Sequence, residues 1–200
     1  MCEPENRPVL LFDVMGTLVY EPFYVEVPAF FGMGLEELLE AKHPTAWAEF
    51  ETGHTDEATL LATFFKDGRK FDHEKLKSCM MKAYRWLDGM EALLTELREA
   101  GFSIQALSNY PVWYRLIEMR LELSRYIQWS FVSCITGVRK PDPEAYLGAV
   151  RALGVDPGDC IFVDDQERNC RTARSVGIDA ILFQNAESLR AEFVARDLLR

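Results

Sequence analysis

Five short apolar runs, separated by segments of helical spacing, constrain the fold more than any other feature of this 200-residue chain. The runs have the length and composition of buried strands: residues 9–12, 103–107, 131–135, 160–163 and 180–183. Helical segments separate the last four runs and begin near Pro111, Asp142 and Asn169. Because strands that alternate with helices form right-handed βαβ units, the sequence predicts an α/β fold with a doubly wound, Rossmann-like parallel sheet.

The segment after the first strand has a different pattern. Apolar residues there recur at helical spacing in groups marked by Leu35, Trp47, Leu60 and Leu76, and no strand pattern occurs between about residues 34 and 90. Asp72 precedes the last group and is suited to cap a helix. We expect a small all-helical domain, residues 19–85, inserted into a core formed by residues 1–18 and 86–200.

Composition and charge narrow the range of partners. The formal net charge is −10 and no run of Lys or Arg occurs, which argues against nucleic acid, because phosphate backbones require clustered cations. No apolar run approaches the roughly 20 residues that span a bilayer, so no membrane partner is expected. The polar residues 1–8 show no signal-peptide pattern, and we expect a cytoplasmic protein.

The five cysteines are an odd number and include no CxxC pair. This usage indicates a reducing compartment, with the thiols acting as small core hydrophobes. Two of them fall in predicted strands. The residues are Cys2, Cys79, Cys134, Cys160 and Cys170, of which Cys134 and Cys160 are the two in strands.

Polar side chains follow the predicted strands at the points where these end. The ends of parallel strands meet at one edge of the sheet, where ligands bind in doubly wound folds. Each group alone could be a helix cap, a solvated loop start or a surface charge, but together they predict a site. Carboxylates this close repel one another unless a cation binds, and an all-oxygen ligand set suits Mg²⁺. The residues are Asp13, Ser108, Asn109, Arg139, Lys140, Asp164 and Asp165.

Four stretches resemble the motifs of the haloacid dehalogenase (HAD) superfamily, in the order in which that family has them. They are LLFDVMGTL (10–18), ALSNY (106–110), GVRKPDPEAY (137–146) and IFVDDQERN (161–169). The resemblance implies a HAD-like core with a small helical cap, and a Mg²⁺-dependent phosphatase that acts on a small phosphate monoester.

The resemblance also implies roles for the residues that handle the phosphoryl group. Asp13 would attack phosphorus and form an aspartyl-phosphate, which water then hydrolyses. Ser108 and Asn109 would hydrogen-bond the phosphoryl oxygens, and Lys140 would neutralise their charge and keep Asp13 ionised.

The same resemblance implies a ligand set for the metal. Asp13 and Asp165 would bind Mg²⁺ directly, and Asp164 would bind it directly or through water. The residue at position 15 would contribute its backbone carbonyl, a role that Met15 can fill.

Met15 departs from the pattern of phosphatases in this family, which usually have an acid/base aspartate two residues after the nucleophile. General acid–base catalysis typically raises the reaction rate about 10²–10⁴-fold, so the loss of this aspartate would slow a phosphatase considerably. Three explanations are open. Another group could substitute: Glu21, Glu26, His43, His54 or a bound water. Alternatively the chain could be a 2-haloacid-dehalogenase-like hydrolase, or a catalytically weak phosphate- or flavin-binding protein. The paired Asp164-Asp165 argues against the dehalogenase, and the intact Asp13 and Lys140 argue against the binding protein.

A narrower resemblance bears on this choice. The stretches DVMGTL, YEPFYVEVPAFFGM, KHPTAW, FFKDGRKFD and SNYPVWY look like the plastid-type FMN hydrolases of plants and algae. In that branch Met also occupies position 15. The resemblance implies FMN as substrate, and the plastid stroma as location if a transit peptide has been removed.

An isoalloxazine ring requires aromatic faces and a few hydrogen-bonding groups. The candidates for substrate contact are Phe23, Tyr24, His43, Trp47 and Tyr110. Core packing between cap helices is the alternative interpretation of each aromatic residue. We expect either a monomer or a homodimer.

Overall fold

The computed structural model describes residues 7–200, so Cys2 and the first six residues of the predicted core lie outside it. All neighbouring strands of its single five-stranded sheet are parallel, in the order β3-β2-β1-β4-β5. The chain winds outward from the central strand in both directions, which confirms the doubly wound α/β fold. The strands are β1 (Val9–Phe12), β2 (Ile104–Ser108), β3 (Gln128–Val132), β4 (Cys160–Asp164) and β5 (Asp179–Leu182).

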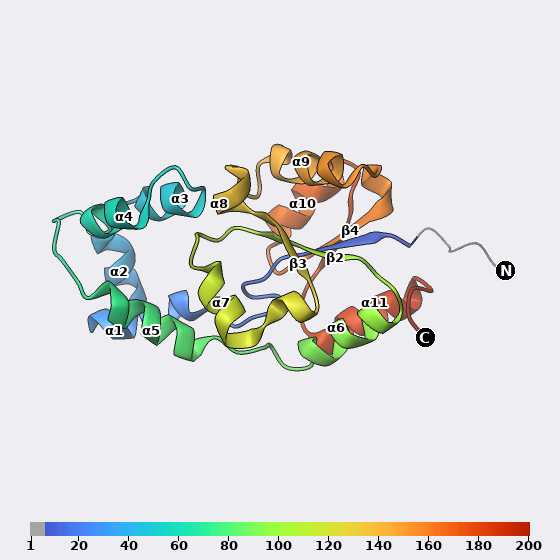
Figure 1. Cartoon of the computed structure of the whole chain (residues 1–200), viewed down its shortest axis with the longest axis horizontal. Helices are drawn as coiled ribbons and strands as arrows, with labels where there is room; N and C mark the ends of the chain where they lie inside the picture. The colour runs from blue at the N-terminus through green and yellow to red at the C-terminus, as the bar shows by residue number, and fades with distance from the viewer. Residues whose placement is uncertain (1–6) are drawn as a thin grey trace.

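Helices cover both faces of the sheet (Figure 1). α9 (Pro143–Leu153) and α10 (Glu167–Ser175) lie on one face, and α6 (Met90–Glu99), α7 (Tyr114–Leu121) and α11 (Ala186–Ala195) lie on the other. Successive residues of a strand point to opposite faces. Leu11 therefore joins the apolar cluster that includes residues of α9 and α10, whereas Leu10 and Phe12 join the cluster that includes residues of α6, α7 and α11.

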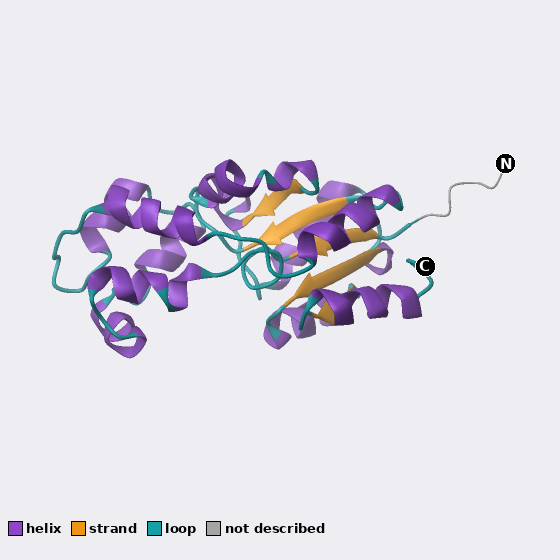
Figure 2. Cartoon of the chain, turned by 90° about the horizontal axis from the view of Figure 1, so that it is seen from below, coloured by secondary structure: helices purple, strands orange, loops and turns teal. Residues whose placement is uncertain are grey.

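The helices that follow β1 gather at one end of the molecule, beyond the strands (Figure 2). Phe31 packs there against Phe64, Phe65 and Phe71, with ring centroids 5.0 to 5.8 Å apart. The side chain of Asp72 accepts a hydrogen bond from the Lys75 amide at 3.1 Å and caps the last helix, as predicted. The elements are η1 (Pro22–Tyr24), α1 (Glu26–Phe31), α2 (Leu35–Ala41), α3 (Ala46–Glu51), α4 (Glu57–Thr63) and α5 (His73–Ala83).

The third strand was predicted over residues 131–135, and this boundary is wrong. β3 ends at Val132, and the following residues form the short helix α8 (Ser133–Thr136), so Cys134 is helical. The turn closes because the Gly137 amide donates to the Ser133 carbonyl at 2.8 Å, with Gly137 at φ 76°. Glycine adopts this left-handed conformation without steric cost, so a short helix can end here. The prediction placed residues 133–135 in the strand because they continue the apolar run that begins at Phe131.

Cys79, Cys134, Cys160 and Cys170 are free thiols, and Cys160 and Cys170 are buried. Within this range no helix combines the length and apolar character needed to cross a membrane. Two short connecting helices, η2 (Leu123–Arg125) and η3 (Pro157–Asp159), complete the fold.

Candidate active site

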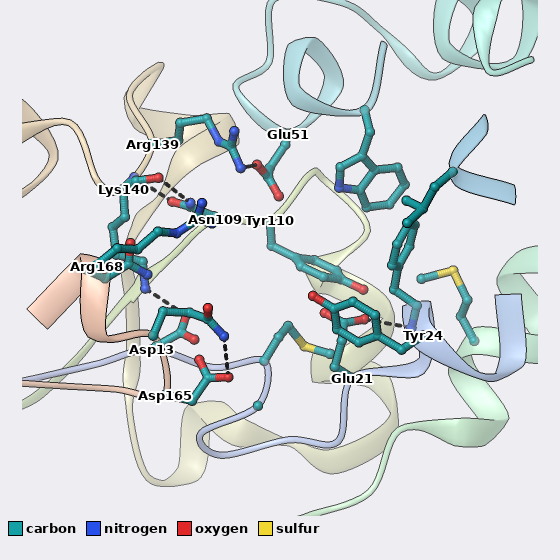
Figure 3. A pocket seen from close by; sticks show the side chains of 18 of the residues that line it. Asp13, Glu21, Tyr24, Glu51, Asn109, Tyr110, Arg139, Lys140, Asp165 and Arg168 are labelled. Atoms are coloured by element: carbon teal, nitrogen blue, oxygen red, sulfur yellow. Dashed lines mark hydrogen bonds and ion pairs between the residues drawn. The ribbon is translucent and has the colours of Figure 1, made fainter. Parts of the chain in front are cut away.

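A pocket of about 370 Å³ opens at the carboxyl edge of the sheet, where the strand ends face the inserted helices. Figure 3 shows Asp13, Asp165 and Lys140 on one side of it, with Glu21 and Tyr24 on another. The position is the one expected for a doubly wound fold. The lining combines carboxylates, cations and aromatic rings: Asp13, Met15, Gly16, Glu21, Phe23, Tyr24, Leu39, Lys42, Trp47, Glu51, Met80, Asn109, Tyr110, Arg139, Lys140, Asp165, Gln166, Arg168 and Asn169.

Asp13 lies directly after β1 and is 8% exposed. Its amide donates to the Val163 carbonyl at 2.9 Å, which ties it to the end of β4. Burial raises the pKa of Asp13 to about 7, against the opposing pull of Lys140 and with a further upward contribution from Asp164. A carboxylate in this position requires neighbouring positive charge to remain ionised.

Lys140 supplies part of that charge. Its Nζ donates to Asp13 Oδ1 at 2.8 Å and to Asp164 Oδ2 at 2.6 Å, and the side chain is 2% exposed. Burial alone would lower the pKa of Lys140, but the two carboxylates outweigh it and the pKa is raised. The ammonium is therefore held in its charged form.

Asn109 holds Lys140 in place through its side chain. Its Nδ2 donates to the Lys140 carbonyl at 2.8 Å, and its Oδ1 accepts from the Lys140 amide at 2.7 Å. We predicted Asn109 as a phosphate ligand, but the structure commits its oxygen and one amide hydrogen to the backbone of the lysine loop. A second amide hydrogen remains for a ligand, since the side-chain amide has two.

Oxygens of Asp13, Asp164 and Asp165 lie within 4.8 Å of one another. This all-carboxylate donor set fits a hard divalent cation such as Mg²⁺. Gly16, at φ 81°, permits the close approach, because a Cβ at this position would lie 2.7 Å from Asp165 Oδ2. The backbone hydrogen bonds of this turn leave the Met15 carbonyl without a donor.

Asp164 is the innermost of the three carboxylates. It is fully buried and lies behind the residues that line the pocket. The side-chain amide of Asn169 donates to both of its oxygens at 3.0 Å, and the Gln166 amide donates to Oδ1 at 2.7 Å. These bonds fix its orientation relative to Lys140 and Asp165.

Ser108 ends β2 and is 2% exposed. Its hydroxyl has no hydrogen-bond partner among residues 7–200, and it does not line the pocket surface. A buried hydroxyl without a partner is costly, which makes it a candidate contact for a ligand oxygen that reaches the floor of the pocket.

The structure brings four of the five predicted substrate contacts into the pocket. The Trp47 ring packs against Phe23 and against Tyr110, with centroid distances of 6.3 and 6.5 Å, and Tyr24 packs edge-on against Phe23 at 5.5 Å. His43 is not among the lining residues, and its ring contacts Thr45 instead. The structure therefore gives no support for His43 as a substrate contact.

Sequence reasoning missed an ion pair at the pocket wall. Arg139, in the loop before Lys140, lies 2.7 Å from a carboxylate oxygen of Glu51 at the end of α3. The Glu51 side chain is buried, and Ser133 Oγ donates to its backbone carbonyl at 2.5 Å. Nothing in the sequence pairs these positions, because the contact depends on how the inserted helices pack on α8.

Comparison with known proteins adds independent information. The model of the haloacid dehalogenase-like hydrolases matches residues 8–177. A chloroplastic flavin mononucleotide hydrolase of Arabidopsis thaliana is 55% identical over 182 residues, which cover 91% of this chain and 74% of that protein. A glyceraldehyde 3-phosphate phosphatase of Methanopyrus kandleri is 33% identical over 89 residues, or 42% of this chain and 37% of that protein.

A solved structure shares the fold. A HAD family enzyme of Bacteroides thetaiotaomicron, in a magnesium complex, superposes with a TM-score of 0.78 at 20% identity, over 94% of this chain and 99% of that one. The chain belongs to the haloacid dehalogenase-like hydrolase family. Within that family it is an enzyme of the phosphoric monoester hydrolase class.

Proposed function

We propose that this enzyme hydrolyses FMN to riboflavin and phosphate, through an aspartyl-phosphate on Asp13 and with Mg²⁺ bound. The observation that carries the proposal is the placement of Asp13. Its carboxylate is buried at the pocket, 2.8 Å from the Lys140 ammonium and within 4.8 Å of two further carboxylates.

In the first step an oxygen of Asp13 attacks phosphorus, and the bond from phosphorus to the ester oxygen breaks. Lys140 stabilises the negative charge on the phosphoryl oxygens and keeps Asp13 ionised. The unpartnered Ser108 hydroxyl donates to a phosphoryl oxygen at the pocket floor. In the second step water attacks the same phosphorus and releases phosphate from Asp13.

Asp13, Asp165 and the Met15 carbonyl would hold Mg²⁺, with Asp164 contributing directly or through water. Bound there, the ion would supply positive charge to the phosphoryl oxygens. The donor set supports this assignment, and Gly16 leaves room for it.

The aromatic wall supports FMN as the substrate. Trp47 and Phe23 offer ring faces and edges from the inserted segment, and Tyr110, which follows β2, adds a ring from the core. The volume of about 370 Å³ lies within the range of small-ligand pockets, about 300–1,000 Å³. The Arabidopsis relative, which acts on flavin mononucleotide by its name, is similar over most of the chain, inserted helices included.

We further propose that residues 19–85 form a cap domain over the core, residues 1–18 and 86–200. The cap would contribute the flavin contacts and the core the phosphoryl chemistry. The chloroplastic relative supports the plastid stroma as the location.

Phosphate release from a panel of phosphate monoesters, with Mg²⁺ and with EDTA, tests this function. FMN and p-nitrophenyl phosphate belong in the panel. Turnover that requires metal and prefers FMN is expected. Halide release from a 2-haloacid without metal would instead establish the dehalogenase alternative. Flavin binding without turnover would establish a binding protein.

A further inference from the structure

We propose that Glu21 is the general acid and base of this site and performs the proton transfers that Met15 cannot. The inference rests on the proposed phosphatase function. The ribityl oxygen of FMN leaves as an alkoxide unless it receives a proton, and the attacking water must lose one. A thioether carries no exchangeable proton, although Met15 lines the pocket beside Asp13.

The structure distinguishes among the four residues that the sequence suggested as replacements for the missing acid/base aspartate. Glu26 accepts a hydrogen bond from the Tyr20 hydroxyl at 3.0 Å and lines a different pocket. His43 and His54 are not among the lining residues, and their rings contact Thr45 and Thr52. Glu21 lines the pocket that holds Asp13.

The other carboxylates of the pocket already have assignments. Asp13 is the nucleophile, Asp165 belongs to the metal set, and Glu51 is paired with Arg139. No hydrogen bond within residues 7–200 engages Glu21 Oε2. Glu21 therefore has one carboxylate oxygen available to a ligand.

The local backbone fixes the direction of this side chain. Glu21 is the N-cap of η1, and its Oε1 accepts a hydrogen bond from the Phe23 amide at 2.9 Å. Pro22, at the first position of the turn, restricts the backbone that carries the carboxyl group. Figure 3 shows Glu21 facing the space between Tyr110 and the Asp13–Asp165 side of the pocket.

The surroundings favour a carboxyl group that holds its proton near neutral pH. Burial, opposed by the Phe23 amide and aided by nearby carboxylates, raises the pKa of Glu21 to about 7. The groups whose charges couple to Glu21 are acids from several elements: Tyr24, Glu26, Glu51, Tyr84, Tyr110 and Asp165. The cations that line the same pocket are Lys42, Arg139, Lys140 and Arg168.

The proton balance closes over the two steps. When the bond from phosphorus to the ribityl oxygen breaks, that oxygen takes the proton of Glu21, and riboflavin leaves as a neutral alcohol. Glu21 is then a carboxylate. It accepts a proton from the water that attacks the aspartyl-phosphate, and this returns Glu21 to its acid form as phosphate leaves Asp13.

The test is Glu21→Gln, which keeps an oxygen for the Phe23 amide and removes the transferable proton. For FMN, kcat should fall about 10²–10⁴-fold. p-Nitrophenolate leaves without a proton, so its release in the first turnover should stay near the wild-type rate. A burst equal to the enzyme concentration should then precede slow turnover, because the second step still lacks its base.

Glu26→Gln is the matched control, because it removes a nearby carboxylate from outside the pocket. Its rates for both substrates should stay close to wild type. A second readout is the pH profile: kcat/KM of the wild type for FMN should decline above about pH 7, and Glu21→Gln should lack this decline.

Three results would overturn the proposal. Glu21→Gln could hydrolyse FMN at the wild-type rate. It could also slow the first turnover of both substrates equally, as a structural defect would. Finally, Lys42→Gln, which alters a lysine that lines the pocket, could slow the reaction of FMN while leaving the first turnover of p-nitrophenyl phosphate unchanged. That result would make Lys42 the proton donor in place of Glu21. Absence of turnover by the wild type would instead refute the proposed phosphatase function.

Discussion

The Lys140 ammonium lies 2.8 Å from a carboxylate oxygen of Asp13, although the two residues are 127 positions apart along the chain. The Lys140 side chain is 2% exposed and the Asp13 side chain is 11% exposed. The ammonium also reaches Asp164 at 2.6 Å, so one cation serves two carboxylates. This relationship governs both the reactivity of Asp13 and the stability of the sheet edge.

Lys140→Met should reduce both stability and activity. The substitution leaves two buried carboxylates without their cation, and breaking a buried ion pair costs about 3–5 kcal/mol. We expect a loss of this size in the free energy of unfolding, measured by urea denaturation in EDTA, together with loss of phosphate release. Arg151→Met is the control, because it removes an exposed ion pair with Glu144 and should change stability by less than about 1 kcal/mol. Wild-type stability of Lys140→Met would contradict the account.

Mg²⁺ should stabilise the wild type through the three clustered aspartates. At 100 times the dissociation constant, one bound ion adds about 2.7 kcal/mol to the free energy of unfolding. Asp165→Asn should abolish most of this gain in thermal unfolding. Glu74→Gln is the control, since it alters the other acidic cluster, Glu57, His73 and Glu74. Loss of the gain in Glu74→Gln, with Asp165→Asn unaffected, would place the ion elsewhere.

Glu21 should make the metal-free protein less stable as the pH rises. Its pKa is about 7 in the folded chain, against 4.5 as the ordinary value. Below pH 4.5 the group is neutral in both states and exerts no penalty, and above pH 7 the penalty for folding with a buried carboxylate is complete. Each pKa unit corresponds to about 1.4 kcal/mol of folding free energy. Because Glu21 is partly exposed, we expect the full loss of stability between the two pH limits to be about 1–3 kcal/mol.

Urea denaturation of the wild type and Glu21→Gln between pH 4.5 and 8 measures this contribution. The stability of Glu21→Gln relative to wild type should rise across that window. A difference that is constant with pH would mean that Glu21 does not titrate in this range.

Trp47→Leu should reduce selectivity for FMN. Loss of an aromatic contact with the flavin costs about 0.5–1.5 kcal/mol, so kcat/KM should fall up to about tenfold. The value for p-nitrophenyl phosphate, which has no flavin ring, should change less. Phe71→Leu removes an aromatic ring from the cluster around Phe31, outside the pocket. It should leave the ratio of kcat/KM for FMN to kcat/KM for p-nitrophenyl phosphate unchanged. An unchanged ratio in Trp47→Leu would remove this residue from the flavin site.

Local patterns predicted the sheet and the residues at its carboxyl edge. The run before Asp13 and the run before Asp164 are buried strands because their residues are apolar and the polar side chains begin where the strands end. Parallel pairing then determines that Asp13, Lys140 and Asp164 meet. These predictions needed only periodicity and the known geometry of doubly wound sheets.

Contacts that depend on tertiary packing could not be predicted from the sequence. The two hydrogen bonds between the Asn109 side chain and the Lys140 backbone join loops that follow different strands, and no local pattern encodes them. The early end of β3 at Val132 was missed for a different reason: the residues of α8 are as apolar as a strand, and the helix is closed by the local turn at Gly137. Glu21 was one of several substitutes for the missing acid until the folded chain placed it in the pocket and His43 outside it.

The most direct test of the central claim is to trap the covalent intermediate on Asp13. Wild-type enzyme mixed with FMN and Mg²⁺, quenched with acid within the first turnovers and digested, is analysed by mass spectrometry. The account predicts that the peptide containing Asp13 gains the mass of one phosphoryl group, and that Asp13→Asn shows neither this peptide nor phosphate release. Phosphate release by Asp13→Asn at the wild-type rate, with no phosphorylated peptide at any quench time, would contradict it.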